Sequence, residues 1–162
     1  MAVTVELAGI DRVDEVRDLW VGLHQHEREV AALPLLADDE LSWQRRRALY
    51  LERLRSGTGF LVLASAVGAT AGYAFVYIEE GPDDTFPLGE RYAELYSLSV
   101  EPRMRGQGIG TQLLDFVDQE LARRAINDLR VAVMAGNSGA QQLYERRGLR
   151  VAELVLYRFG EP

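Results

Sequence analysis

Apolar residues along this chain recur with two different spacings, and each change of spacing marks the start of a predicted element. Short apolar or alternating runs predict strands over residues 3–7, 60–65, 71–79, 92–100, 129–134 and 151–159. Apolar positions three and four apart predict helices over residues 11–30, 40–55, 109–125 and 140–147. The last strand segment is counted as one or two strands, so the predicted order is β-α-α-β-β-β-α-β-α-β-β.

This order predicts the fold class. Successive strands, followed by strands that alternate with helices, indicate an α/β protein with a mixed sheet and helices on both faces. With 162 residues, 48% of them hydrophobic, the chain can bury a substantial core, and we expect residues 1–162 to form a single domain. The segment Glu80–Arg91 carries two prolines and two glycines, which predicts an exposed loop beside the functional site.

The net charge of −7 narrows the range of partners. Nucleic acid requires a positive surface, so we expect no nucleic-acid partner, and a cationic acceptor such as an amine suits this charge better. No apolar stretch approaches the roughly 18 residues that a membrane helix needs. Glu6 and Asp11 lie where a signal peptide would be apolar. We therefore expect a cytoplasmic protein without a membrane partner.

The chain contains no cysteine and only two histidines, which limits its chemistry. A thiolate nucleophile and a cysteine-based zinc site are excluded. His24 and His26 are two residues apart, unlike the i, i+4 pair of a zinc-binding helix. We therefore expect no metal site.

The segment Arg105–Thr111, RGQGIGT, lies between a predicted strand and a predicted helix. Its glycines expose backbone N–H groups where a helix begins, which is an arrangement that binds anions. The segment lacks the G-x-G-x-x-G spacing of a dinucleotide site and the lysine of a P-loop. Both familiar nucleotide motifs are therefore excluded.

Three segments within residues 71–159 resemble, in the same order, the GNAT superfamily of N-acetyltransferases. RGQGIGT resembles the family's acetyl-CoA signature, Arg or Gln-x-x-Gly-x-Gly or Ala. The strand YAELYSLSV precedes it, and NSGAQQLYERRGL resembles the later Asn-x-x-Ala-x-x-Leu-Tyr segment. The resemblance implies the GNAT fold, a mixed, mostly antiparallel sheet with one splayed pair of parallel strands. It also implies an acetyl-CoA-dependent N-acetyltransferase that moves the acetyl group directly to a primary amine.

The same resemblance implies where acetyl-CoA binds. Backbone N–H groups of the glycine segment, aided by the helix dipole, would hold the pyrophosphate. The pantetheine arm would pair with the preceding strand like an extra strand, and a backbone N–H of that strand would stabilise an oxyanion. The implied cofactor-binding residues are Leu98, Ser99, Val100, Arg105, Gly106, Gln107, Gly108, Ile109, Gly110, Thr111, Asn137 and Tyr144.

Transfer to an amine requires a general base and an acid that protonates the departing thiolate. Tyr144 occupies the position of the family's general acid, although a core tyrosine would also explain it. Glu94 occupies the position of a catalytic glutamate in some members, and an outward-facing strand glutamate explains it equally well. His24, His26 or water are the other candidates for the base, although histidines at the surface are the ordinary expectation.

The alternation of a regular strand separates the residues around Glu94 into two faces. One face would carry Glu94, Tyr96, Leu98 and Val100, and the other would carry Leu95, Ser97 and Ser99. A β-bulge, which is common in this family, would break the alternation.

The first two predicted helices and the loop over residues 80–91 are expected to line the acceptor pocket. Acidic residues there would attract a cationic amine and aromatic residues would flank it, although an acidic surface loop and an aromatic sheet face explain them too. These residues are Glu79, Glu80, Asp83, Asp84, Tyr73, Phe75 and Tyr77. The acceptor is a small-molecule amine or a protein amine, and the sequence does not choose between them.

Three other functions fit parts of the pattern. The chain could be a non-catalytic acyl-CoA-binding or regulatory module, an enzyme that uses a longer acyl-CoA, or an unrelated α/β binding protein. Separately, the strands expected over residues 151–159 would offer an edge for a homodimer.

Overall fold

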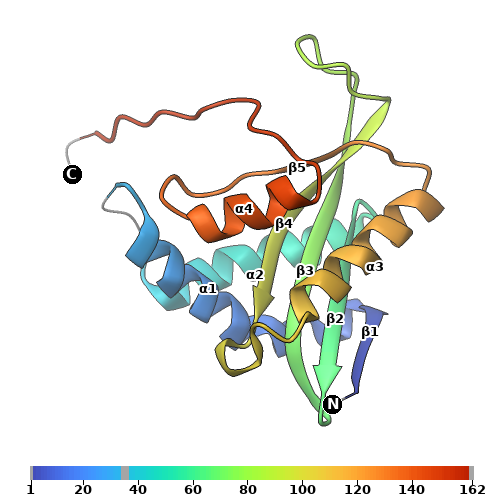
Figure 1. The fold of residues 1–162 in the computed structure, drawn as a ribbon, viewed down its shortest axis with the longest axis vertical. Helices are drawn as coiled ribbons and strands as arrows, with labels where there is room; N and C mark the ends of the chain where they lie inside the picture. The colour runs from blue at the N-terminus through green and yellow to red at the C-terminus, as the bar shows by residue number, and fades with distance from the viewer. Residues whose placement is uncertain (1, 34–36, 161–162) are drawn as a thin grey trace.

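The computed structural model describes residues 2–33 and 37–160, and its centre is a five-stranded sheet (Figure 1). The strands lie side by side in chain order, and they are β1 (Val3–Ala8), β2 (Gly59–Ala66), β3 (Ala69–Glu80), β4 (Arg91–Val100) and β5 (Leu129–Val131). Neighbours from β1 to β4 are antiparallel, whereas β5 runs parallel to β4. The predicted mixed, mostly antiparallel sheet is confirmed.

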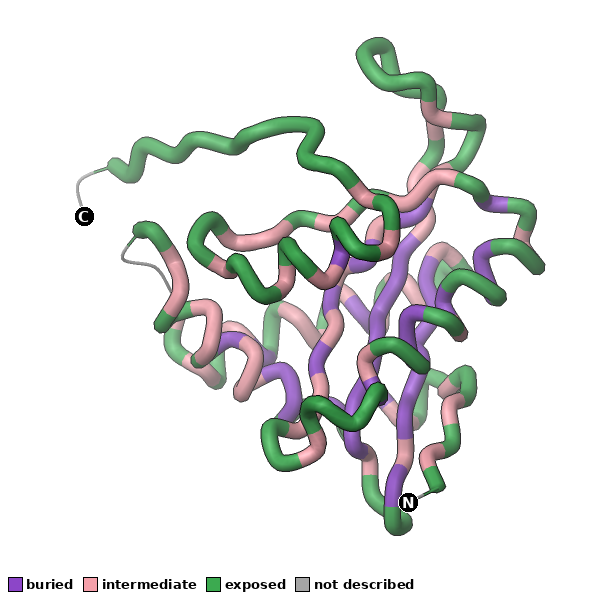
Figure 2. The backbone as a smooth tube through the Cα atoms, viewed as in Figure 1, coloured by how far each residue is buried: buried purple, intermediate pink, exposed green. Residues whose placement is uncertain are grey.

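Helices cover both faces of the sheet, as predicted (Figure 1). α1 (Arg17–Val30) and α2 (Asp39–Arg55) pack on one face, and α3 (Ile109–Arg123) and α4 (Ser138–Arg146) pack on the other. Each pair encloses its own apolar core against the sheet, so the central strands are the most deeply buried segments (Figure 2). None of the described helices combines the length and the apolar composition that a bilayer span requires.

The first helical segment differs from the single helix predicted over residues 11–30. Ile10–Val16 is a 3₁₀ helix, and the α-helix begins only at Arg17. The sequence contains the reason, because Ile10, Val13 and Val16 are spaced by three, and a 3₁₀ helix with three residues per turn places such positions on one side. Val13 and Val16 are buried against the sheet.

A β-bulge in β4 changes which side chains share a face. Phe75 of β3 pairs with Ser97, but the next residue along β3 pairs with Leu95, so Tyr96 is the extra residue. As a result Glu94, Tyr96, Ser97 and Ser99 face α1 and α2, whereas Leu95, Leu98 and Val100 face α3 and α4. The face assignment of a regular strand is therefore wrong beyond Tyr96.

The strands predicted over residues 151–159 are absent from the part of the chain that the structure describes. Val151–Gly160 pairs with no described strand, and its apolar side chains are exposed, with Leu154 at 85% and Leu156 at 90% (Figure 2). An alternating pattern shows that the side chains of a segment would fit a half-buried sheet. The segment becomes a strand only where the edge of a neighbouring strand is free to pair with it. β5 is also shorter than the predicted 129–134, since pairing ends at Val131.

Candidate active site

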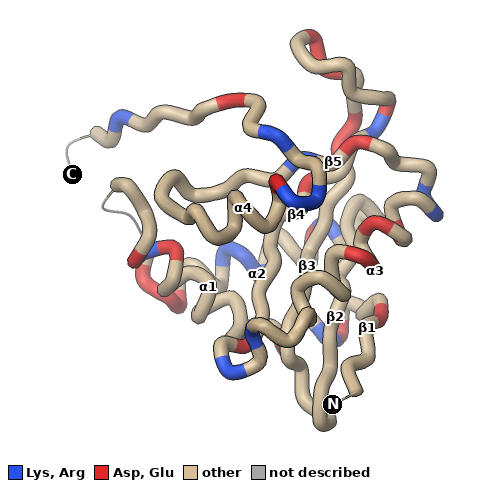
Figure 3. Tube along the Cα trace, viewed as in Figure 1, with Lys and Arg blue, Asp and Glu red and all other residues tan. Residues whose placement is uncertain are grey.

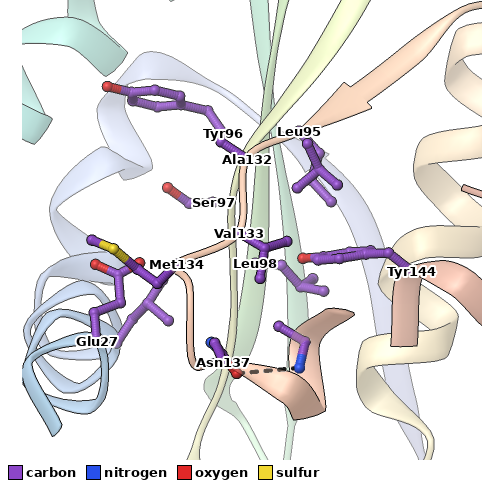
Figure 4. A pocket seen from close by; sticks show the side chains of 13 residues that line it. Glu27, Leu95, Tyr96, Ser97, Leu98, Ala132, Val133, Met134, Asn137 and Tyr144 are labelled. Atoms are coloured by element: carbon purple, nitrogen blue, oxygen red, sulfur yellow. Dashed lines mark hydrogen bonds between the residues drawn. The ribbon is translucent and has the colours of Figure 1, made fainter. Parts of the chain in front are cut away.

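The two parallel strands separate after three paired residues, and a cavity of about 70 Å³ lies in the opening. β4 and β5 pair from Ala93 to Leu95 and from Leu129 to Val131, and the chains then diverge (Figure 4). The cavity is lined from β4, from the segment after β5, from α4 and from α1, by Leu95, Tyr96, Ser97, Leu98, Val131, Ala132, Val133, Met134, Asn137, Ala140, Tyr144, Leu23 and Glu27. The splayed pair implied by the resemblance is therefore present.

The end of β4 presents backbone groups to this opening. The N–H of Glu101 donates to the carbonyl of Ala71 in β3 at 2.8 Å. Because peptide groups alternate along a strand, the N–H groups of Val100 and Leu98 point to the opposite edge, toward the opening. The carbonyl of Val100 also points away from β3, where it accepts a hydrogen bond from Arg105 Nε at 3.2 Å.

Ser99 is placed differently from the other two predicted pantetheine contacts. Its backbone lies opposite Tyr73 in β3, and its hydroxyl donates to the carbonyl of Leu19 at 3.0 Å. The same alternation that turns Leu98 and Val100 toward the opening turns the peptide groups of Ser99 away from it. The strand therefore offers two of the three predicted residues to a ligand.

The glycine segment forms the start of α3. Gly106 and Gly108 have φ angles of +74° and +80°, a left-handed conformation that favours glycine, and Gly108 is the N-cap of α3. No described side chain caps this helix, and its first turn carries no acidic residue. By contrast, Asp38 Oδ1 caps α2 and Asn137 Oδ1 caps α4. The first backbone N–H groups of α3 are thus available to an anion.

The remaining residues of this segment keep the approach open. A Cβ atom added at Gly110 would meet only Val100 Cγ2, at 3.9 Å. Gln107 Nε2 donates to the carbonyl of Arg103 at 3.5 Å, and the exposed Arg105 reaches back to β4. No described side chain accepts a hydrogen bond from the N–H groups of Ile109, Gly110 and Thr111 at the helix start.

Tyr144 projects from α4 into the opening (Figure 4). Its side chain is 9% exposed, and burial raises the pKa of its hydroxyl to about 12. The hydroxyl therefore holds its proton at neutral pH, as a general acid must.

Asn137 is held beside α1 by a close backbone approach. Its Oδ1 accepts from Ala140 N at 3.2 Å, which caps α4. The preceding Gly136 has a φ of +100°, and a Cβ there would overlap the carbonyl oxygen of Val30 at the end of α1. Only glycine allows this approach, which joins the start of α4 to the end of α1 at the cavity.

Glu27 of α1 lines the cavity from the side opposite Tyr144, and the sequence reasoning missed it (Figure 4). Burial raises the pKa of its carboxyl, and nearby Arg46, His24 and His26 act in the opposite direction. A signal was present in the sequence, because Glu27 lies four residues after Leu23 on the apolar side of the helix.

Glu94 lies away from the cavity. It sits where β4 and β5 are still paired, opposite Arg130, whose Nε is 3.3 Å from Glu94 Oε2. Its carboxylate also lies near Tyr77, where burial and then the negative charge of Glu94 raise the pKa of the Tyr77 hydroxyl. The bulge and the divergence of the strands both begin after Glu94, so its carboxylate is not among the groups that line the opening.

The two histidines occupy different environments. His24 is buried, stacks on Trp20 at a centroid distance of 5.8 Å, and donates from Nε2 to the carbonyl of Ala37 at 2.9 Å. The expectation of a surface position is therefore wrong for His24. His26 is more exposed, with Nδ1 4.0 Å from Glu29. Among the described residues, no three potential ligands gather as a metal site.

The residues predicted to attract and flank the acceptor serve the fold instead. Tyr73 and Phe75 are fully buried in the core beneath α1 and α2, and Tyr77 is nearly so. Glu79 pairs with Arg53 at 2.7 Å. Glu80 ends β3, and the loop that follows it carries Asp83 and Asp84 and projects from the end of the sheet opposite the glycine segment (Figure 1). None of these three residues lines the cavity between β4 and β5.

A second cavity, of about 350 Å³, lies between α1 and α2, and Tyr96 lines both this cavity and the first. It is lined by Trp20, His24, Ala37, Ser42, Arg45, Arg46, Leu49 and Tyr96. The first two helices thus line a cavity, whereas no residue of the loop over residues 80–91 lines either of the two cavities. Which residues line the acceptor pocket stays a prediction.

Comparison with known proteins identifies the family. Residues 14–149 match the model of the Acetyltransferase (GNAT) family. The chain belongs to the GNAT acetyltransferase family. This match confirms the resemblance carried by the glycine segment and the two segments that flank it.

Individual GNAT relatives match only part of this chain. An L-methionine sulfoximine/L-methionine sulfone acetyltransferase of Pseudomonas aeruginosa is 29% identical over 66% of this chain and 59% of the relative. A [ribosomal protein bS18]-alanine N-acetyltransferase of Escherichia coli is 36% identical over 38% of this chain and 42% of the relative. The chain therefore matches about half the length of these curated relatives.

A solved structure shares the fold along most of both chains. It is a predicted acetyltransferase from Clostridium acetobutylicum, crystallised with acetyl-CoA, and it is 16% identical with a TM-score of 0.74. The similarity covers 98% of this chain and 96% of the other. The GNAT fold is thus confirmed for the chain as described.

Proposed function

We propose that this protein is an acetyl-CoA-dependent N-acetyltransferase that moves the acetyl group directly to a primary amine. The observation that carries the proposal is the opening between β4 and β5, where Tyr144 and Glu27 approach from opposite sides. The names of the relatives support transfer to an amine, and the acetyl-CoA complex of a protein with the same fold supports the donor.

Acetyl-CoA would extend from the start of α3 into the opening. Its pyrophosphate would accept hydrogen bonds from the N–H groups of Gln107–Thr111, and Arg105 would add positive charge beside it. The pantetheine arm would pair with the free peptide groups of Leu98 and Val100, while the Asn137 amide contacts it from α4. This arrangement would place the thioester in the cavity beside Tyr144.

The reaction then needs three proton movements. The acceptor enters as an ammonium ion and gives a proton to Glu27, and the freed lone pair attacks the thioester carbonyl. A backbone N–H at the edge of β4 would stabilise the oxyanion. The C–S bond breaks, Tyr144 protonates the thiolate, and the new amide nitrogen loses its remaining extra proton. The products are the acetylated amine, coenzyme A and one released proton.

Glu27 is our choice for the base, in place of the Glu94 assignment that the resemblance suggests. Glu27 lines the cavity, and its raised pKa makes its carboxylate a stronger base than an ordinary glutamate. Glu94 is engaged by Arg130 and Tyr77 at the paired end of the strands. The assignment to Glu94 remains a prediction that the same experiments address.

A matched pair of glycine variants tests the donor site. Acetyl-CoA at a hundredfold excess over its Kd is expected to raise the Tm of the wild type by roughly 5–10 °C in differential scanning fluorimetry. Gly108→Trp should abolish this shift, because an indole would stand over the helix start. Gly68→Trp is the control, since Gly68 has a similar φ of +75° and open space but lies in the turn between β2 and β3.

An equal shift in the wild type and in Gly108→Trp would place acetyl-CoA elsewhere. The absence of any shift in the wild type would favour an unrelated binding protein. The mass of the ligand that copurifies with the chain distinguishes acetyl-CoA from a longer acyl-CoA.

Three broader expectations remain predictions: a cytoplasmic location, a single domain over residues 1–162, and a homodimer. The homodimer rests on the exposed apolar segment Val151–Phe159, which a second copy would cover. Light scattering tests it, with an expected mass of twice 18.2 kDa.

A further inference from the structure

The guanidinium of Arg46 lines the second cavity beside Tyr96, the residue that both cavities share, and we call this place the junction. It is held between two aromatic rings, 3.9 Å from the centroid of Trp20 and 4.0 Å from that of Tyr96. Its Nη1 lies 3.5 Å from the carbonyl oxygen of Tyr96 and 3.4 Å from Ser97 Oγ, two residues that also line the first cavity. Cation–π contacts with two rings hold the guanidinium in place, and the side chain lines the second cavity.

This half-buried cation has no carboxylate partner within 4.0 Å among the described residues. Two other arginines of α2 are paired, since Arg47 contacts Asp14 at 2.6 Å and Arg53 contacts Glu79 at 2.7 Å. A partly buried charge without a partner is costly, and in a chain of net charge −7 a partner would be easy to supply. The unpaired edge therefore suits an anionic ligand group.

Acidic positions cluster where α1 ends and α2 begins (Figure 3), and three of these acids have partners of their own. Asp39 pairs with Arg28 at 2.9 Å, Glu40 pairs with Arg17 at 2.9 Å, and Asp38 caps α2. The described residues that line the cavity include two arginines and no acid. The pocket is thus locally cationic although the protein as a whole is anionic.

The rest of the cavity has an apolar character. Trp20, Leu49 and Tyr96 offer carbon surface, and the volume of about 350 Å³ lies at the small end of ligand sites. Glu27 lines the first cavity, on the other side of the junction. Burial raises the pKa of Glu27 and the charge of Arg46 opposes this rise, although the two side chains form no ion pair within 4.0 Å. The guanidinium of Arg46, which can bind an anion, and the carboxylate of Glu27, which can bind a cation, together match a zwitterion.

Resting on the proposed function, we infer that the acceptor is a free α-amino acid with an apolar side chain, whose carboxylate binds Arg46 while its amine faces Glu27. In an α-amino acid a single carbon separates the two groups, so a carboxylate held at the junction keeps the amine beside Ser97 and the thioester site. The side chain would occupy the space lined by Trp20 and Leu49. Polycationic acceptors would meet Arg45 and Arg46, and a peptide amino terminus would lack the carboxylate.

Matched acceptors test this inference with the wild-type protein. L-leucine, L-leucinamide and 3-methylbutylamine share a side chain and differ only in the carboxylate, which is present, amidated or removed. We expect kcat/KM for L-leucine to exceed that for each of the other two by roughly 10- to 100-fold, the range for hydrogen bonds to charged groups. We also expect 4-methylpentanoate, which lacks the amine, to inhibit competitively against L-leucine, and 4-methylpentanamide not to inhibit.

Variants assign the preference to one side chain. Arg46→Gln should lower kcat/KM for L-leucine far more than for L-leucinamide, so that most of the preference for the acid is lost. Arg46→Lys should restore part of the preference, because it keeps the charge and loses the planar fork. Arg47→Gln is the matched control, since it removes the same charge from the neighbouring position, whose side chain points to Asp14.

The outcomes separate this inference from the function beneath it. Equal or better transfer to L-leucinamide and 3-methylbutylamine would overturn the amino-acid assignment and leave the acetyltransferase intact. An equal loss for acid and amide in Arg46→Gln would make Arg46 a structural residue and would also overturn the assignment. Binding of acetyl-CoA without transfer to any amine would contradict the proposed function itself. The inhibition pattern needs no variant, so it decides the matter even if Arg46→Gln folds poorly.

Discussion

Replacing Tyr144 with Phe is expected to lower kcat about 10²- to 10³-fold and to leave the Kd for acetyl-CoA within about twofold. The substitution removes one hydroxyl from the opening between β4 and β5 and keeps the ring that packs in the apolar core beneath α3 and α4. Without this proton donor the coenzyme A thiolate would leave unprotonated. Steady-state kinetics with a saturating amine, together with calorimetric titration of acetyl-CoA, separates the two effects.

The pH dependence offers a second test of Tyr144. Burial raises the pKa of its hydroxyl to about 12, so it keeps its proton throughout the range in which an exposed tyrosine ionises. Ionisation of Tyr144 should therefore cause no loss of kcat between pH 8 and 10. Any loss that the wild type shows in this range should also be present in Tyr144→Phe. Tyr157→Phe serves as the control, because Tyr157 is exposed in the C-terminal segment. A kcat for Tyr144→Phe within threefold of the wild type would exclude the role of general acid.

Glu27→Gln should lower kcat/KM about 100-fold at neutral pH, because the amide cannot accept the proton of the acceptor. The raised pKa of Glu27 moves the rising limb of the pH profile above the range of an ordinary glutamate, and the variant should lose that limb. Initial rates from pH 5 to 9 measure both effects. Turnover in the variant close to that of the wild type would contradict the assignment.

The stability of the same variant should change in the opposite direction. A carboxyl group whose pKa is raised by folding holds its proton more tightly in the folded state, so it lowers stability as pH rises from the unfolded pKa through the folded one. Glu27→Gln should therefore have a higher Tm than the wild type at pH 7, and this gain should disappear at low pH, where Glu27 is protonated in both states. A loss of activity with a gain in Tm is not what damage to the fold produces.

Glu94→Gln is the matched comparison. We expect its kcat/KM to remain within about threefold of the wild type, because Glu94 contacts Arg130 and Tyr77 rather than the cavity. If Glu94→Gln loses more activity than Glu27→Gln, the base is Glu94, as the sequence resemblance suggested.

The parts of the site that the sequence predicted lie within continuous motifs. The glycine segment forms the start of α3, and Asn137 and Tyr144 belong to one short helix, so their spacing along the chain fixes their spacing in space. Glu27 and Arg46 come instead from the first two helices, and they reach the site only because α1 and α2 pack against β4. Such long-range placement leaves no local motif.

The bulge and the second cavity show the limits of pattern and of overall charge. Alternation predicted one face for Glu94 and Leu98, but the bulge at Tyr96 places them on opposite faces. The net charge of −7 suggested a cationic acceptor, whereas the second cavity carries Arg45 and Arg46. The net charge of a protein describes its surface on average. The sign of the charge inside one cavity depends on which acidic residues pair with other side chains, and a count of charged residues does not give that information.

The most direct test of this account is acetyl transfer by the wild-type protein to a panel of primary amines. The panel would include apolar α-amino acids, their amides, a polyamine, an aminoglycoside and a peptide amino terminus. We predict equal formation of coenzyme A thiol and N-acetyl product, intersecting double-reciprocal plots, and no gain of an acetyl group by the protein. Tight binding of acetyl-CoA without transfer to any amine would contradict the account and would favour a non-catalytic acyl-CoA-binding module.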